Sequence, residues 1–125
     1  MATQFASVIL ENKGGIFDVK ILPFEAQYSA IQGVEEFDFN SDGHNDLLIA
    51  GNMFNTSDEI PQADANYGLL LLGDGKGNYT EEDLGASGFY VPGDVRAIKM
   101  INFKNQKVIL VANNNGKLQS FITDY

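Results

Sequence analysis

Residues 37–52 read FDFNSDGHNDLLIAGN, a cluster of acidic and amide side chains that runs directly into an apolar segment. Counted from Asp38, oxygen-bearing side chains stand at positions 1, 3, 5 and 9 (Asp38, Asn40, Asp42 and Asp46), with glycine at position 6. Calcium binds about six to eight oxygen ligands in flexible geometry, and glycine permits the sharp turn that brings alternate side chains together. The spacing therefore predicts a calcium loop, with His44 at position 7 contributing its backbone carbonyl.

The surroundings of this loop differ from those of an EF-hand. An EF-hand has a glutamate at position 12 and a helix on each side, whereas position 12 here is Ile49, within the strand-like run LLIAG. We therefore expect the loop to connect two β-strands, with Asp46 at the start of the outgoing strand as the last carboxylate. Two alternatives stay open: a magnesium site, or a turn rich in Asn and Asp that binds no metal.

The rest of the chain also has the pattern of short strands. Apolar segments are brief, are bounded by Gly, Asn and Asp, and never keep a helical period for three turns, so we expect an all-β fold with almost no helix. The stretches ENKGGIF and GDGKGNY are typical of hairpin turns that need positive φ. The expected strands are 5–11, 16–22, 33–39, 46–51, 67–72, 78–84, 95–101, 107–112 and 117–122.

These segments repeat along the chain. A shift of 62 residues aligns Phe5 with Tyr67 and Gly15 with Gly77, and a shift of 61 aligns Phe37 with Ile98. Two copies of a unit of about 60 residues, each with four strands, indicate antiparallel β-propeller blades. The alternative is a single sandwich of eight or nine strands. In the second copy Lys99 and Lys107 replace Asp38 and Asp46, so we expect one metal site rather than two.

Composition narrows the function classes. The chain has 125 residues, a formal net charge of −9 and no cysteine, which argues against nucleic acid, a disulfide framework and a thiol nucleophile. No run is long enough to span a membrane, and MATQFASVIL has no signal-peptide pattern. With one histidine and one arginine, we expect no enzyme.

These motifs resemble the FG-GAP/VCBS repeat, the blade of integrin-α-like β-propellers, through DFNSDGHNDLLIAGN and YGLLLLGDGKGNYT. The C-terminal ILVANNNGKLQSF is similar to the closing end of large bacterial repeat proteins with a cartilage-acidic-protein-like propeller region. The resemblance implies a calcium-stabilised, non-catalytic module for adhesion or recognition, secreted or on the cell surface (bacterial outer membrane or extracellular). It implies the last two strands of one blade in 1–30, a full blade with the calcium loop in 31–90, and the first three strands of the next blade in 91–125.

A propeller needs at least four blades, so this partial set implies either a piece of a longer chain or a homo-oligomer. The expected partner is a protein or glycan, with no nucleic acid and no membrane insertion. Alternatives are a self-assembling structural fragment and an accessory part of a polysaccharide-active enzyme. The long polar connection 52–68 is either a ligand contact or an ordinary insertion. Tyr28, Phe89 and Tyr90 either form an aromatic contact patch or pack into the core.

Overall fold

A computed structural model describes residues 1, 3–52 and 66–123, which form an all-β protein built from antiparallel sheets. The all-β antiparallel prediction is thus confirmed, and each of the nine expected strands is present. The two helical segments, η1 (Phe24–Gln27) and α1 (Leu84–Ser87), have four residues each, and no helix among the described residues is long and apolar enough to cross a membrane. The strands are β1 (Val8–Lys13), β2 (Ile16–Ile21), β3 (Gly33–Phe37), β4 (Asp46–Ala50), β5 (Leu69–Gly73), β6 (Tyr79–Glu82), β7 (Val95–Phe103), β8 (Gln106–Asn113) and β9 (Gln119–Thr123).

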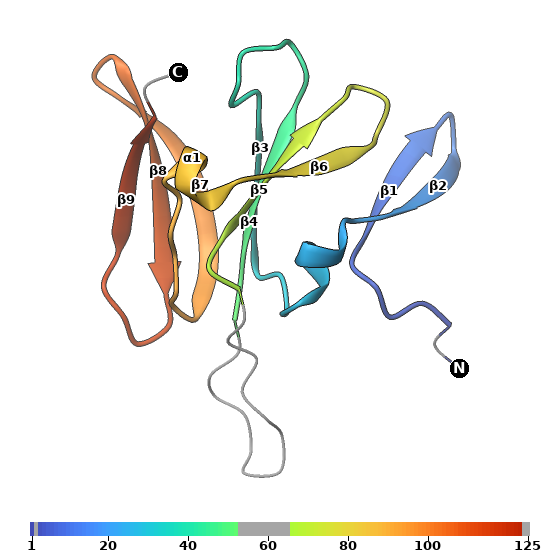
Figure 1. Cartoon of the computed structure of the whole chain (residues 1–125), viewed down its shortest axis with the longest axis horizontal. Helices are drawn as coiled ribbons and strands as arrows, with labels where there is room; N and C mark the ends of the chain where they lie inside the picture. Colours follow the sequence, from blue (N-terminus) through green and yellow to red (C-terminus); the bar gives the residue numbers. More distant parts are fainter. Residues whose placement is uncertain (2, 53–65, 124–125) are drawn as a thin grey trace.

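The strands are grouped into three sheets in chain order. The hairpin β1–β2 stands alone, β3–β4–β5–β6 form the central sheet, and β7–β8–β9 form the C-terminal sheet. Figure 1 shows the central sheet between the other two. The sheets hold two, four and three strands and lie within 1–30, 31–90 and 91–125. Most of the connection 52–68, residues 53–65, lies outside the described residues.

The inner strands of the central sheet, β4 and β5, are buried on both faces. All five residues of β4 are buried, and because side chains alternate across a strand, they divide between two cores. Leu48 and Ala50 pack toward the C-terminal sheet with Val95 and Ile109. Leu47 and Ile49 pack on the opposite face, against Leu22 and Ala26 of the N-terminal part. Burial on both faces explains why LLIA and LLLL read as continuous apolar runs rather than as alternating strands.

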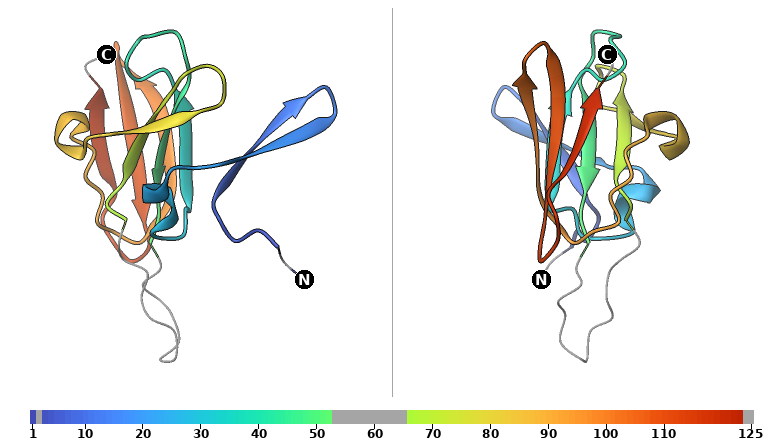
Figure 2. Two further views of the ribbon diagram at one scale, coloured as in Figure 1. Left: turned by 45° about the vertical axis from the view of Figure 1, so that its right-hand side comes forward. Right: turned by 90° about the vertical axis from the view of Figure 1, so that its left-hand side faces the viewer.

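The two flanking sheets are covered to different degrees. Figure 2 shows the C-terminal sheet against the central sheet, while the β1–β2 hairpin projects to the side. A β-carbon added at Gly33 would lie 2.7 Å from Cγ1 of Ile98, so β3 approaches β7 where glycine provides the space. On the hairpin, five of the six residues of β2 are exposed. Its exposed apolar side chains include Leu10, Ile16, Phe17, Val19 and Ile21.

The strand register changes how the two copies of the repeat correspond. Ala50 pairs with Gly33, and Val111 pairs with Ile98. From Ala50 to Val111 is 61 positions, as the sequence comparison assumed, but from Gly33 to Ile98 is 65. The match of Phe37 with Ile98 is therefore wrong: the structural counterpart of Ile98 is Gly33. Between its paired ends the first hairpin carries residues 38–45, whereas the second closes with a turn at residues 104–105.

Lys99 and Lys107 accordingly lie within paired strands and not in a loop. Lys99 pairs with Leu110 in the β7–β8 ladder, and its amine is 2.9 Å from the Glu35 carboxylate of the neighbouring sheet. Lys107 pairs with Asn102, and its amine lies over the ring of Phe37. The second copy thus holds a strand extension where the first copy has its acidic loop.

Candidate metal centre in the β3–β4 loop

Four of the five candidate ligands lie in the connection between β3 and β4, next to the β5–β6 turn at one end of the central sheet, and the fifth, Asp46, begins β4 (Figure 1). The pairing of Phe37 with Asp46 closes the hairpin around residues 38–45. Two residues of the loop take the left-handed conformation, Ser41 at φ 61° and Gly43 at φ 88°. Glycine populates this region without steric penalty, so the tight curl predicted at Gly43 is present.

The side chains at positions 1, 3 and 5 turn inward and bind the loop's own backbone. The two carboxylate oxygens of Asp38 accept hydrogen bonds from the N–H of Asp42 at 3.1 Å and of Gly43 at 2.9 Å. The Asn40 carbonyl also accepts from the N–H of Asp42, at 3.0 Å, while its amide donates to Oδ2 of Asp42 at 3.0 Å. These bonds favour a curled loop without any ion, which is the behaviour expected of Asx turns.

Asp42 is held as a carboxylate by its neighbours. Its Oδ1 accepts a hydrogen bond from the backbone N–H of His44 at 2.8 Å. This bond, and secondarily the amide of Asn40, lowers the pKa of the exposed Asp42 carboxyl below its ordinary value. Asp42 therefore carries its negative charge over the whole physiological pH range.

Asp46 lies in a different environment from the other acids of the loop. Its side chain is fully buried, and Oδ2 accepts a hydrogen bond from the N–H of Phe39 at 2.8 Å. Oδ1 accepts from the N–H of Gly73, at the end of β5, at 2.9 Å. The Asp46 carboxylate thus connects Phe39, at the start of the acidic loop, to Gly73 at the end of β5. Buried backbone N–H groups need acceptors, so Asp46 has a structural role whether or not it also binds a cation.

The His44 side chain is exposed and faces the β5–β6 turn. A β-carbon added at Gly75 would collide with the imidazole ring, and Gly75 itself has φ 68°. The His44 side chain therefore contacts the neighbouring turn at Gly75, while its backbone N–H donates to Asp42 within the acidic loop. Sequence reasoning did not include Phe39, Gly73 or Gly75 in this region. Their contacts join separate elements, and no local spacing reveals them.

The chemistry of the donor set fits a hard cation. Three carboxylates and one amide carbonyl lie within one short loop, and oxygen ligands of this kind suit calcium. Among the described residues, however, no group of three or more His, Cys, Asp or Glu side chains is arranged to hold a metal ion. The loop side chains bind backbone N–H groups instead. Calcium binding therefore remains a prediction from the spacing and from the oxygen donors.

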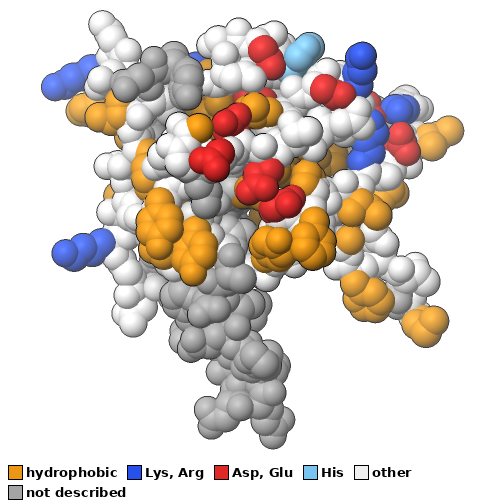
Figure 3. All heavy atoms as spheres, in the orientation of Figure 1, with side chains coloured by type: hydrophobic (Ala, Val, Ile, Leu, Met, Phe, Trp, Pro, Cys, Tyr) orange, Lys and Arg blue, Asp and Glu red, His pale blue; other side chains and the backbone are white. Residues whose placement is uncertain are grey.

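The charge distribution of the molecule favours positively charged partners in general. On the face seen in Figure 3, acidic side chains gather over the middle beside hydrophobic ones, and lysine and arginine side chains lie toward the edges. The whole chain has a formal net charge of −9. Such a surface attracts cations and basic groups and repels anionic polymers.

Comparisons of the chain with protein-family models, with curated proteins and with solved structures give no match. The resemblance to FG-GAP/VCBS repeats consequently rests on the motifs of the chain itself.

Proposed function

We propose that this protein is a non-catalytic, calcium-binding module of FG-GAP/VCBS-type β-propeller blades. In this proposal it serves structure and the recognition of a protein or glycan, as a secreted or cell-surface component. The observation that carries the proposal is the central four-stranded antiparallel sheet. Its inner strands are covered by the C-terminal sheet on one face and by the segment with Leu22 and Ala26 on the other. Stacking of successive sheets along the chain is how repeat units bury hydrophobic faces that none covers alone.

The proposed cation site uses the loop between β3 and β4, the first two strands of this central sheet. Asp38, Asn40, Asp42 and Asp46 would supply side-chain oxygens and His44 its backbone carbonyl. A bound calcium ion would supply positive charge to offset the repulsion among the three carboxylates. The loop residues themselves keep the curl through their bonds to the N–H groups of Asp42, Gly43 and His44.

The proposal is tested by thermal unfolding of the chain in EDTA, in calcium and in magnesium. A cation that binds only the folded state, at 100 times its dissociation constant, adds about 2.7 kcal/mol. For a domain of this size that corresponds to a rise in Tm of about 10 °C. Asp42→Ala should remove most of the rise. Asp74→Ala is the matched control, since Asp74 is also an exposed acid that binds turn N–H groups, in the β5–β6 hairpin.

The result decides between the calcium loop and its alternatives. A rise in calcium alone that Asp42→Ala abolishes and Asp74→Ala keeps supports the calcium loop. An equal rise in magnesium would favour the magnesium alternative. Equal Tm values in EDTA and calcium would leave a metal-free turn and remove the cation from the proposal.

Self-assembly is the second candidate, because the β1–β2 hairpin leaves apolar side chains exposed. Phe17 is 59% exposed and Ile21 66% exposed, and large exposed apolar patches mark interaction surfaces. The C-terminal sheet has three strands in the order β7–β8–β9, and among the described residues no strand pairs with the outer edge of β9. Light scattering coupled to size-exclusion chromatography separates the candidates: a monomeric mass across a concentration series contradicts self-assembly.

A further inference from the structure

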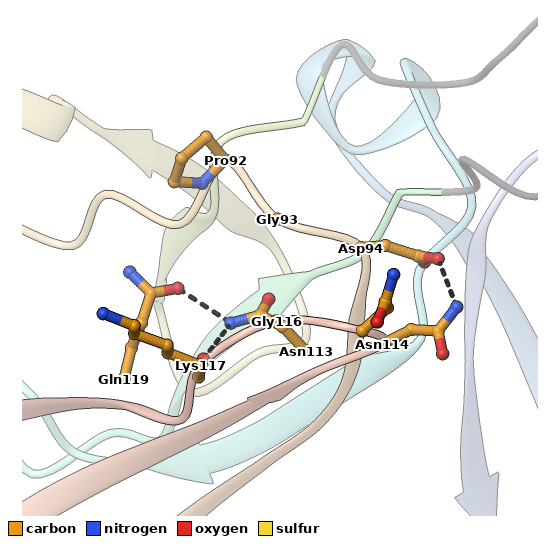
Figure 4. Close-up of a pocket in the computed structure, with 9 residues that line it drawn as sticks. Pro92, Gly93, Asp94, Asn113, Asn114, Gly116, Lys117 and Gln119 are labelled. Carbon is orange, nitrogen blue, oxygen red and sulfur yellow. Dashed lines mark hydrogen bonds between the residues drawn. The ribbon is translucent and has the colours of Figure 1, made fainter.

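A cavity of about 460 Å³, lined mostly by polar residues, lies at the end of the C-terminal sheet, away from the acidic loop. The segment that enters β7 forms one wall, with Pro92, Gly93 and Asp94, and the β8–β9 turn forms the other, with Asn113, Gly116 and Lys117. Figure 4 shows these side chains around the cavity. Its volume lies in the range of sites for small molecules, about 300–1,000 Å³.

Two oxygen atoms of the cavity residues are buried and have no hydrogen-bond donor among the residues that the structure describes. They are Oδ1 of Asp94 and Oδ1 of Asn113. The side chain of Asp94 is only 2% exposed. A buried acceptor left without a partner is costly, and native proteins seldom keep one without a reason. Both residues line the cavity, so a donor bound there would lie beside two acceptors that lack one.

The two side chains are otherwise firmly positioned. The Asn113 amide donates to the carbonyl of Lys117 at 3.1 Å and to Oε1 of Gln119 at 3.0 Å (Figure 4). Glycines leave room for it on both sides. A β-carbon at Gly93 would lie 2.8 Å from Cγ of Asn113, and one at Gly116 would lie 3.0 Å from its Cβ. Any larger residue at either glycine would therefore displace this amide.

The charge of the site favours a neutral ligand over a cation. Oδ2 of Asp94 already accepts from the Arg96 guanidinium at 2.9 Å and from the Asn114 amide at 3.1 Å. Lys117 adds a second positive group at the rim. With the carboxylate charge offset in this way, the two acceptors need O–H or N–H donors rather than a metal ion.

An exposed aromatic pair includes Tyr90, which comes shortly before the cavity residue Pro92 in the chain. Tyr67 and Tyr90 stack with ring centroids 5.5 Å apart and planes 11° from parallel, and they are 45% and 56% exposed. Tyr90 lies two residues before Pro92, a span of about 7 Å in extended chain. The side-chain amide of Asn52 connects the residue before Tyr67 to the cavity wall, because it donates to the carbonyls of Asn66 and Gly93.

The other aromatic residues of the expected patch lie elsewhere. Phe89 belongs to the core and packs on Phe121 at 4.9 Å. Tyr28 packs edge-on against Phe24. The three-residue patch of Tyr28, Phe89 and Tyr90 does not form, and Tyr90 pairs with Tyr67 instead.

From this combination we propose that the cavity binds a neutral saccharide residue. Hydroxyl groups of the sugar donate to Asp94 and Asn113, and its apolar C–H face packs on Pro92 and on the ring of Tyr90. The inference rests on the recognition role proposed above and narrows it to a carbohydrate. It requires nothing of the calcium loop, so the melting experiment and the binding experiment fail independently.

The test uses the full chain and ligand-observed saturation-transfer NMR. The probes are methyl glycosides of neutral hexoses and N-acetylhexosamines at millimolar concentration. We expect transfer to the ring C–H protons of at least one probe, and at least tenfold weaker binding in Asp94→Asn. Tyr90→Ala, a change at an exposed position that leaves the core intact, should also abolish the signal. The matched control is Tyr28→Ala, which removes a similarly exposed tyrosine outside the site.

Each outcome decides the proposal. Binding that Tyr90→Ala abolishes and Tyr28→Ala preserves supports the saccharide site, and it does so even if Asp94→Asn fails to fold. No transfer to any glycoside overturns it, as does transfer that Tyr90→Ala leaves unchanged. Calcium-dependent stabilisation that Asp94→Asn removes and Asp42→Ala leaves intact would assign the cavity to a cation and also overturn it.

Discussion

Replacing Asp46 with alanine removes the buried carboxylate that joins the acidic loop to β5. The backbone N–H groups of Phe39 and Gly73 both lose their acceptor, and both bonds lie in the interior. A hydrogen bond to a charged group contributes about 1.5–3 kcal/mol, so two sum to about 3–6 kcal/mol. Removing a buried carboxylate also removes its desolvation penalty, which offsets part of the loss. We therefore expect Asp46→Ala to lower the free energy of unfolding by about 3 kcal/mol.

Urea denaturation measures this loss, with EDTA present so that no cation contributes. Asp46→Asn is the informative intermediate, because its single carbonyl oxygen keeps one of the two acceptors while its amide faces the other N–H. We expect about half the loss in this variant. Asp74→Ala serves as the control, since Asp74 makes its bonds in an exposed turn, and it should lower the midpoint less than Asp46→Ala does. A loss below about 1 kcal/mol for Asp46→Ala, at unchanged m-value, would refute the role assigned to this carboxylate.

Two further predictions concern the turns at the same end of the sheet. Gly14 and Gly75 have the same φ of 68°, but only at Gly75 would a β-carbon meet another side chain, that of His44. Each Gly→Ala change should cost about 1 kcal/mol for the left-handed backbone. The clash with His44 should add a further cost at Gly75, and His44→Ala should remove that extra cost. Equal urea midpoints for the two variants would contradict the contact. Hydrogen bonds from the Asn78 side chain, and then from the backbone N–H groups of Lys76 and Asn78, lower the pKa of Asp74 to about 2. The resulting stabilisation should be complete above pH 3.8 and lost as the pH falls through about 2; carbon NMR titration should show this pKa rising toward 3.8 in Asn78→Ala, and an unchanged value would exclude that bond as the cause.

The local parts of the fold were predictable from sequence. All nine strands appear where short apolar runs end at Gly, Asn or Asp, because strand pairing in a hairpin depends on turns a few residues long. Their ends were less predictable: residues 5–11 were expected where β1 spans Val8–Lys13. The register of β7 was also not predicted. In the β7–β8 hairpin the paired strands continue to a short turn, whereas the β3–β4 hairpin has its acidic loop at the corresponding place.

The candidate loop likewise has features that were predictable from sequence and one that was not. The curl at Asp38, Asn40 and Asp42 follows from spacing, since each side chain binds an N–H at most five residues away. The role of Asp46 does not, because one of its partners is Gly73, 27 positions along the chain.

By itself the sequence determined the all-β class, the nine strands, the turns and the grouping of oxygen-bearing side chains in one loop, all of which depend on neighbours along the chain. Only the tertiary structure decided which apolar strands are covered on both faces and which are left exposed. It alone brought Asp94 next to Asn113 and Tyr67 onto Tyr90. The reason is physical: burial and unpaired hydrogen-bonding groups depend on which surfaces meet when sheets pack, and residues far apart in the chain meet only then.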